Sequence, residues 1–449
     1  MKILLIRPRP DPETIGLQHV MVCEPLELEY LGAVALDLGV QVEIVDMILE
    51  TRPLDWFIQL HQPDIVGMTG YITHVGIIRS YAKQIKQILP NCFVIVGGVH
   101  AEVLPEDFSC PEIDWVVVRN SLQVFKHIIQ DPKGGPWEGV YQEGIEGVRC
   151  AEVPMIMPAR DLVSKYRSRY YYMFHQPCAL IKTSYGCPFS CRFCFCREIT
   201  GREYATRDLQ SVIDEIHQIP EKEIYIVDDD FMVSRERVLD FCQMLQKSGL
   251  DKHFLIYART DFIAMNEDVV EVFRDHGLKA VIIGLESNRE ADLDRYHKHN
   301  SIANNEAAVQ ILHKHGVDIY GTIILGPDFS RQDFVHLGNW ITKLGIFFIN
   351  LQPLTPLRGT ELYTDYRDQI ILSELDYPYW DLAHLVIRPE HMSIRRYYWE
   401  IIRLYGRIMI NPRSAWMMVQ RYGFRPTLKM AIGSSKVAWQ YWKKIWKGK

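Results

Sequence analysis

Long hydrophobic runs are absent from this sequence, and no stretch reaches the length of a transmembrane span. The apolar start ends at Arg7 and Pro8, too early for a signal peptide. The net charge of −6 gives no global reason to expect nucleic-acid binding. Ten cysteines occur in 449 residues, but four of them lie within positions 187–196, which argues against a disulfide framework. We therefore expect a cytoplasmic protein with a metal site and no nucleic-acid partner.

The first part of the chain alternates short apolar strands with helix-like stretches. The expected strands are Ile3–Ile6, Val42–Val45, Ile65–Thr69, Phe93–Val96 and Trp115–Val118. Each is mostly β-branched, which is typical of buried parallel strands. The pattern predicts a doubly wound, Rossmann-like α/β domain over residues 1–135, with a ligand crevice beyond the C-terminal strand ends. Asp46, Thr69, Gly97 and Gly98 stand at those ends.

A proline-dotted segment, residues 136–176, is expected to link this domain to a second one. Residues 177–372 resume the alternation, with expected strands at Ala179–Thr183, Ile224–Val227, Phe254–Tyr257, Ala280–Ile283, Tyr320–Leu325 and Phe347–Leu351. Expected helices include Asp208–Gln218, Arg235–Lys247, Asp268–His276 and Ile302–His315. Six strand–helix units predict a partial (β/α)6, TIM-like barrel, whose chemistry lies at the C-terminal strand ends. The cysteine cluster is expected directly after the first of these strands.

The cysteines follow the pattern Cys187-x-x-x-Cys191-x-x-Cys194, preceded by Tyr185-Gly186 and with Phe193 before the last cysteine. Three thiolates can ligate three irons of one cluster and leave a fourth iron open. This motif resembles the radical S-adenosylmethionine (SAM) superfamily. The resemblance implies that Cys187, Cys191 and Cys194 hold a [4Fe-4S] cluster. It also implies that the open iron binds SAM, that an electron donor of flavodoxin or ferredoxin type reduces the cluster, and that a 5′-deoxyadenosyl radical forms.

A zinc site is the alternative for these cysteines, with Cys196 as a fourth ligand. Zinc sites usually consist of two separated ligand pairs. No second Cys or His pair stands at the usual distance, so we expect Cys196 to be a neighbour of the cluster rather than a ligand.

The same resemblance implies further SAM contacts at the ends of later strands. Asp228 and Asp229, in Asp228-Asp229-Asp230, are expected near the SAM amino group, although three adjacent acids can also form an ordinary turn. Arg259 could pair with the SAM carboxylate, or with Asp261. Glu286 could accept hydrogen bonds from SAM. No catalytic residue is assigned.

Two phrases of the N-terminal domain, Pro63–Thr69 and Val96–Ala101, resemble the cobalamin-binding domain fused ahead of radical SAM domains. The resemblance implies cobalamin contacts from Thr69, Gly97 and Gly98, because glycine lets the backbone approach a flat ring. Tyr71 is a candidate for the lower face of the cobalt.

His74 is a second candidate for the lower face of the cobalt, and the sequence departs from the family pattern at several positions. The motif Asp-x-His-x-x-Gly, which supplies an axial histidine elsewhere, is absent. Residues 118–121 read Val-Arg-Asn-Ser where relatives usually carry Gly-Glu. The alternative is a structural relic that binds no cofactor. Residues 354–360 also resemble a segment of cobalamin-linked members, with Arg358 in place of an expected proline.

Residues 373–449 are expected to form a helical region rich in tryptophan and in basic residues. It holds six of the ten tryptophans, and from position 391 it has thirteen Lys and Arg but only one acid, Glu400. One interpretation is a cap on the barrel with buried tryptophans. The other is peripheral contact with the inner membrane, because Trp439, Trp442 and Trp446 share one helical face. No nucleic-acid-binding module is recognisable here.

The resemblance covers nearly all of residues 1–370. Within it, the sequence is most similar to hopanoid C-3 methylases, and the anaerobic magnesium-protoporphyrin ester cyclases are a more distant likeness. Segments 7–21 and 24–30 carry the hopanoid likeness. It implies transfer of a methyl group from methylcobalamin to an unactivated carbon of a hydrophobic small molecule such as a hopanoid lipid. Two alternatives remain: ring formation or oxidation of a tetrapyrrole without methyl transfer, and a non-enzymatic iron–sulfur or cobalamin sensor.

Overall fold

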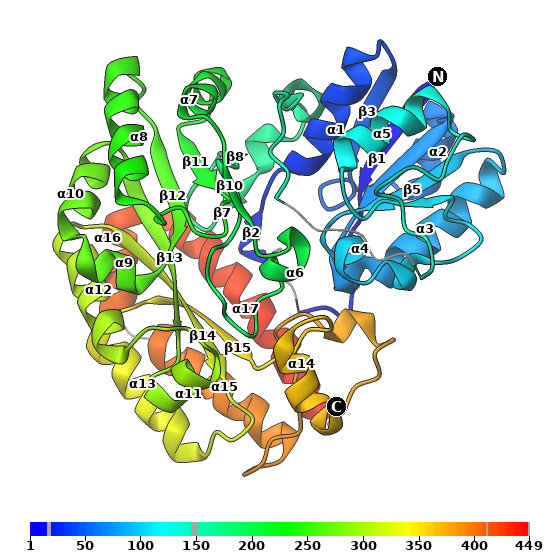
Figure 1. The fold of residues 1–449 in the computed structure, drawn as a ribbon. Helices are drawn as coiled ribbons and strands as arrows, with labels where there is room; N and C mark the ends of the chain where they lie inside the picture. The colour runs from blue at the N-terminus through cyan, green and yellow to red at the C-terminus, as the bar shows by residue number, and fades with distance from the viewer. Residues whose placement is uncertain (16–18, 145–150, 410–411, 448–449) are drawn as a thin grey trace.

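The computed structural model describes residues 1–15, 19–144, 151–409 and 412–447. Two α/β domains stand side by side, and a helical C-terminal region packs against the second (Figure 1). The expected fold class is confirmed. Gly16, Leu17 and Gln18, which carry part of the hopanoid likeness, lie outside the described residues.

The N-terminal domain is built on a five-stranded parallel sheet in the order β3-β1-β4-β5-β6. Its strands are β1 (Lys2–Arg7), β3 (Gln41–Asp46), β4 (Ile65–Thr69), β5 (Phe93–Gly97) and β6 (Trp115–Val116). Its helices are α1 (Leu26–Asp37), α2 (Leu54–His61), α3 (Val75–Ile88), α4 (Val99–Val103) and α5 (Ser121–Gln130). The strand order reverses between β1 and β4, and open sheets of this kind bind ligands beyond such a switch point.

The strand expected at Trp115–Val118 is only two residues long, which corrects the prediction. Val117 forms an antiparallel bridge with Val140, so the parallel strand ends at Val116.

The second domain is a six-stranded parallel sheet in chain order, β8-β11-β12-β13-β14-β15, with no pairing between its first and last strands. The strands are β8 (Cys178–Ile181), β11 (Glu223–Ile226), β12 (His253–Ala258), β13 (Leu278–Glu286), β14 (Asp318–Leu325) and β15 (Phe348–Pro353). The outer helices are α7 (Leu209–Gln218), α8 (Arg235–Ser248), α9 (Thr260–Met265), α10 (Glu267–Asp275), α11 (Glu290–Arg295), α12 (Ile302–Lys314) and α13 (Arg331–Leu344). This is the expected partial barrel.

Local sequence signals fix the ends of its helices. The Ser234 hydroxyl accepts from the backbone N–H of Arg237 at the start of α8, and Gly249 ends that helix in the left-handed conformation. Such caps satisfy backbone groups that a helix leaves without partners. Apolar faces of these helices then cover the β-branched strands to form the barrel's main core.

The cysteines do not follow β8 directly, contrary to expectation. A hairpin intervenes, in which β9 (Ser184–Gly186) pairs antiparallel with β10 (Tyr204–Thr206), and its loop carries the cysteines and α6 (Cys196–Thr200). Gly186 has a φ of +80°, and a Cβ there would collide with the Glu203 carbonyl. Glycine is therefore required where the chain turns into the cysteine loop.

The segment between the domains packs more closely than an ordinary linker. It contains the short 3-10 turns η4 (Arg160–Val163) and η5 (Arg167–Arg169), and β7 (Tyr171–Tyr172) pairs antiparallel with β2 (Met21–Val22). Tyr166 and Tyr170 are fully buried.

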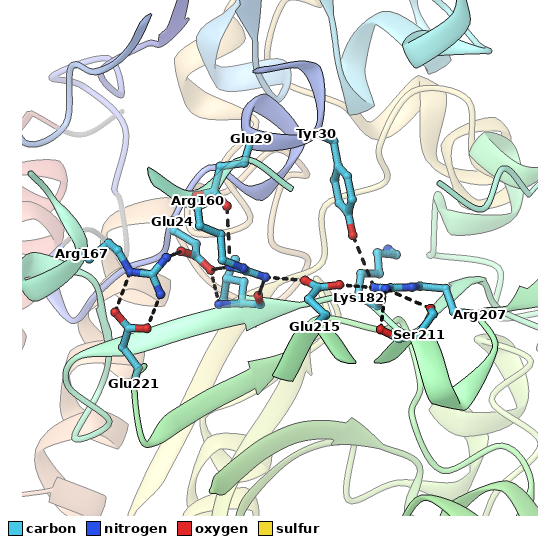
Figure 2. A network of polar contacts seen from close by, with 11 residues as sticks. Glu24, Glu29, Tyr30, Arg160, Arg167, Lys182, Arg207, Ser211, Glu215 and Glu221 are labelled. Atoms are coloured by element: carbon cyan, nitrogen blue, oxygen red, sulfur yellow. Dashed lines mark hydrogen bonds and ion pairs between the residues drawn. The ribbon is translucent and has the colours of Figure 1, made fainter. Parts of the chain in front are cut away.

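A buried ion network anchors this segment to both domains (Figure 2). The Arg160 guanidinium donates to Glu24, ahead of α1, and to Glu215 of α7, both at 2.5 Å. It also donates to the Leu180 carbonyl of β8 at 2.7 Å. Charge-assisted bonds of this kind fix geometry tightly when both partners are buried. Arg160 therefore helps to set the placement of the N-terminal domain on the barrel.

The barrel domain ends with α14 (Glu361–Tyr366) and the short turn η6 (Arg367–Gln369). The C-terminal region then comprises the turn η7 (Tyr377–Tyr379) and the helices α15 (Ile394–Met409), α16 (Pro412–Tyr422) and α17 (Phe424–Lys447). None of the helices in the described ranges is long and apolar enough to cross a membrane.

Candidate functional site

The cysteine loop lies on the face of the barrel that meets the N-terminal domain, where α6 stands between the two (Figure 1). Cys187, Cys191 and Cys194 are partly buried free thiols. The backbone N–H of Arg192 donates to the Tyr296 carbonyl at 3.0 Å, and its side chain pairs with Asp365 of α14 at 2.6 Å. The loop is thus held from two later elements of the barrel.

Positive charge approaches the thiols from the strand ends. Arg259 Nη1 lies 3.9 Å from Cys191 Sγ. Burial raises the pKa of Cys191, while Lys298 and Arg259 oppose that rise. Burial also raises the pKa of Cys187 to about 12. Metal ligation requires thiolates, which nearby cations favour. The donor set and its cationic surroundings therefore fit an anionic iron–sulfur cluster.

The fourth cysteine of the run hydrogen-bonds its neighbours. The Cys196 thiol donates to Asp229 Oδ1 at 3.2 Å, and its contact with Cys194 lowers the pKa of Cys194. Among the described residues no three or more His, Cys, Asp or Glu side chains are arranged to hold a single metal ion. A zinc site needs that convergence, whereas the thiolates of a cluster each bind a different iron.

The three acids after β11 have different surroundings. Asp228 is buried and accepts three hydrogen bonds, from the Thr183 N–H and hydroxyl at 2.6 Å and from the Ser184 hydroxyl at 2.7 Å. It ties β11 to the start of the cysteine hairpin. Asp229 is partly exposed beside Cys196.

Asp230 is the acid that the site residues named from sequence did not include. Burial raises its pKa to about 7, and Oδ2 has no hydrogen-bond partner among the described residues. A buried, unpartnered carboxylate oxygen beside the cysteine loop suits the ammonium group of SAM. Asp230 belonged to the recognised run of acids. Burial distinguishes it from Asp229, and the unpartnered oxygen distinguishes it from Asp228, which is also buried.

Arg259 is held by its own segment. It donates to Asp261 at 2.7 and 3.0 Å and to the Lys298 carbonyl at 2.6 Å, and it lies over the Phe189 ring of the cysteine loop. The pairing with Asp261 was one of the two roles expected for it. Its Nη1 still faces Cys191, so the side chain adjoins the proposed cluster position.

Glu286 ends β13 with a φ of +60°, an uncommon conformation for a residue other than glycine. Its side chain pairs with Lys298 at 2.6 Å, and both are buried. Strained backbone of this kind is typical of functional sites. Lys298 was missed from sequence, because a lysine between His297 and His299 after α11 gives no signal of burial.

The expected cobalamin contacts lie at the C-terminal ends of β4 and β5. Gly98 has a φ of +93°, and a Cβ there would collide with the Thr69 hydroxyl, so protein neighbours alone require this glycine. A Cβ on Gly97 would meet nothing closer than Val117 at 3.7 Å. Thr69 and Gly97 are partly exposed at this sheet edge, which leaves room for a flat ring to approach the backbone.

Tyr71, after β4, and Tyr257, in β12, lie on the two domains near their boundary. Their side chains are 58% and 36% exposed. Burial raises the pKa of Tyr71 to about 12, and the nearby Tyr257 hydroxyl adds to that rise. Burial also raises the pKa of Tyr257. The two hydroxyls are therefore close enough to influence one another across the boundary.

His74 lies beside Tyr71 and caps a turn. Its Nδ1 accepts the Tyr71 backbone N–H at 3.3 Å, which leaves the proton of the neutral ring on Nε2. Burial and Arg7 lower its pKa to about 4.

Two hollows lie away from the cysteines. One is beside Gly277, near the N-terminal ends of β12 and β13, and the other is beside Gln310, between α12 and α13.

Arg358, which stands where a proline is expected, makes a second contact between the domains. Its guanidinium donates to Asp107 of the 3-10 turn η3 (Pro105–Phe108) at 3.0 Å. Asp107 also binds His100 Nε2 at 2.8 Å and the Tyr377 hydroxyl at 3.1 Å. These partners lower the pKa of Asp107, which is therefore ionised.

The fold and the site together define a cobalamin-dependent radical SAM enzyme. Residues 181–341 match the Radical SAM superfamily and residues 13–129 match the B12 binding domain. The chain belongs to the radical SAM superfamily with an N-terminal B12-binding domain, and its cofactors are a [4Fe-4S] cluster, SAM and cobalamin.

Individual relatives sharpen this assignment. The hopanoid C-3 methylase of Methylococcus capsulatus is 24% identical over 96% of this chain and 84% of its own. The anaerobic magnesium-protoporphyrin IX monomethyl ester cyclase of Cereibacter sphaeroides is 23% identical over 74% of this chain and 57% of its own. The cobalamin-dependent SAM radical enzyme OxsB, solved with aqua-cobalamin and SAM, shares the fold with a TM-score of 0.71 at 15% identity, over 98% of this chain and 72% of its own.

Proposed function

We propose that this enzyme transfers a methyl group to an unactivated carbon of a hydrophobic polycyclic substrate, with a hopanoid as the first candidate. The observation that carries the proposal is the likeness to hopanoid C-3 methylase, which runs through both α/β domains and into the C-terminal region. An unactivated carbon offers no acidic proton for general-base catalysis, so a radical route suits this substrate class.

Each set of residues would hold one cofactor. Cys187, Cys191 and Cys194 would hold the cluster, and the SAM contacts would come from Asp228, Asp229, Asp230, Arg259 and Glu286. Thr69, Tyr71, Gly97 and Gly98 would border cobalamin. When bound, the cluster with SAM supplies a carbon-centred radical, and cobalamin supplies a transferable methyl group. The substrate carbon would lie between these two centres, near Tyr71 and Tyr257.

Two partners follow from this chemistry. A one-electron donor of flavodoxin or ferredoxin type would reduce the cluster. A hopanoid is a membrane lipid, so the proposal includes peripheral contact with the inner membrane.

The first test is anaerobic reconstitution of the full chain with iron, sulfide and hydroxocobalamin, followed by metal analysis after desalting. We expect about four irons and about one cobalt per chain. The loaded enzyme is then incubated with a reductant, a pentacyclic hopanoid and SAM that carries a labelled methyl group. A product with one labelled methyl group supports the proposal. Iron without cobalt, or SAM cleavage with no labelled lipid from any hopanoid tried, contradicts it.

Ring closure without methyl transfer is the second candidate, because two anaerobic magnesium-protoporphyrin IX monomethyl ester cyclases match 74% and 93% of this chain. Magnesium-protoporphyrin monomethyl ester replaces the hopanoid in the same assay. A product that has lost hydrogen and gained no labelled carbon would favour this candidate.

A further inference from the structure

The last helix, α17, has one face packed on the protein. Met430, Tyr441 and Lys444 are buried along this inner face. Gly433 lies so close to the His19 carbonyl that a Cβ would collide with it. A helix of 24 residues is held along much of its length by these contacts.

The opposite face of α17 exposes large apolar side chains. Phe424, Leu428, Ile432, Trp439 and Trp446 are 66%, 47%, 51%, 62% and 80% exposed. Their spacings of four and seven residues place them in one stripe along the helix. Exposed stripes of this size mark interaction surfaces in soluble domains. We call these five side chains the outer stripe.

Basic residues border the outer stripe. Arg425, Lys436 and Lys443 are exposed and stand three or four residues from members of the stripe, so they are its neighbours on the helix surface. Within the described part of the chain they form no ion pair. No acid occurs in the sequence after Glu400. The outer stripe is therefore an apolar surface bordered by basic side chains.

The rest of the region continues this surface. Trp442, which is 38% exposed, stacks edge-on against Trp399 of α15 with ring centroids 5.7 Å apart. Trp416 of α16 is 64% exposed. Of the six tryptophans in this region, only Trp380 is buried. The interpretation in which this region is a cap with buried tryptophans is therefore wrong for the other five.

We propose that the outer stripe of α17 docks on an anionic lipid bilayer, with the helix lying in the plane of the interface. Tryptophan rings suit the headgroup level, and the neighbouring cations attract anionic lipids. A second copy of this chain fits less well, because it would bring two cationic faces together.

Docking would bring part of the N-terminal segment to the membrane together with α17. On the inner face of α17, Gln440 Nε2 donates to the Thr14 carbonyl at 3.1 Å, and Lys444 pairs with Glu13 at 3.2 Å. A docked enzyme would meet a lipid substrate at the bilayer surface. This consequence rests on the proposed function, because only a lipid substrate benefits from it.

Vesicle binding of the full chain tests the docking surface without substrate or activity. Purified protein is sedimented with vesicles of phosphatidylcholine alone or with phosphatidylglycerol added. We expect binding to the anionic vesicles, a blue shift of tryptophan fluorescence, and release at high salt because screening removes the cationic contribution. Failure here would leave methyl transfer untouched, since a detergent-dispersed substrate tests that separately.

Two double variants and their controls locate the contact. Trp439→Ser/Trp446→Ser and Lys436→Glu/Lys443→Glu are each expected to weaken binding to anionic vesicles at least tenfold. Leu60→Ser/Met265→Ser removes two exposed apolar side chains elsewhere, and Lys83→Glu/Lys247→Glu makes the same charge change elsewhere; both should bind as the unaltered chain does. The altered side chains are exposed, so thermal unfolding should not change.

Three outcomes would overturn the proposal: no binding of the unaltered chain to anionic vesicles, equal binding by the α17 variants and the controls, or a dimer in solution that the tryptophan variant dissociates. The last result would assign the stripe to a second copy of this chain.

Discussion

The two halves of the proposed site are built from different parts of the polypeptide. On the barrel rim the chemistry lies in side chains: three thiols, a buried acid and the Glu286–Lys298 pair. On the N-terminal domain it lies in backbone shape, where Gly97 ends β5, Gly98 follows it and Thr69 ends β4. A side-chain site is readable from sequence because each residue type brings its own reactivity. A backbone site is defined by open space, which sequence shows poorly.

Removal of a single thiol should have the largest effect on the site at the barrel rim. Cys187→Ala, Cys191→Ala or Cys194→Ala should each abolish SAM cleavage, because two thiolates cannot hold a cluster with one open iron. SAM cleavage and iron content after reconstitution measure the effect. Cys196→Ala is the matched control and should largely retain both. Unaltered cleavage rates in any of the first three variants would refute the assignment.

Replacement of Gly97 or Gly98 by alanine tests the part of the site that the backbone forms on the N-terminal domain. Gly98→Ala should lower the free energy of unfolding by about 3 kcal/mol, because the φ is positive and the Cβ meets the Thr69 hydroxyl. Gly97→Ala should leave stability almost unchanged and weaken cobalamin retention. Thermal unfolding and bound cobalt distinguish the two. Full cobalt retention by Gly97→Ala would remove this glycine from the cofactor contact.

Acid should destabilise the N-terminal half through His74. Its folded-state pKa is about 4 against 6.5 in the unfolded chain, so the unfolded chain binds the proton first. Stability should therefore fall as the pH drops from about 6.5 to about 4, by about 2 kcal/mol because the ring is partly exposed. His74→Gln should flatten this part of the profile, measured by denaturant unfolding across that range. An unchanged slope would show that His74 is solvated.

The smallest effect on stability is expected for the ion pair between Arg358 and Asp107, which joins the two domains. Arg358→Met removes the Asp107 ion pair but leaves the His100 and Tyr377 hydrogen bonds to that carboxylate. We expect a loss of about 1 kcal/mol. The exposed Arg367→Met is the control, with thermal unfolding as the readout. A loss no larger than that of the control would show that Arg358 does not secure the interface.

Prediction from sequence succeeded where a pattern was local. Strand–helix alternation predicted both sheets and their parallel strands, because buried strands are β-branched and their periodicity differs from that of helices. The sequence prediction placed the cysteines directly after β8, whereas they lie in the loop of the hairpin formed by β9 and β10. The segment from Ser184 to Thr206 is too short and too mixed in composition to reveal that β9 and β10 pair.

The sequence by itself determined the class of enzyme, since the spacing of three cysteines dictates which metal group they can bind, and it determined the alternation that gives two α/β domains. Tertiary structure alone decided which acid of Asp228–Asp230 keeps a buried carboxylate oxygen without a partner, that Lys298 reaches Glu286, and which side of α17 faces outward. The physical reason is that burial, charge pairing and exposure depend on neighbours far apart in the chain, and residue type does not encode them.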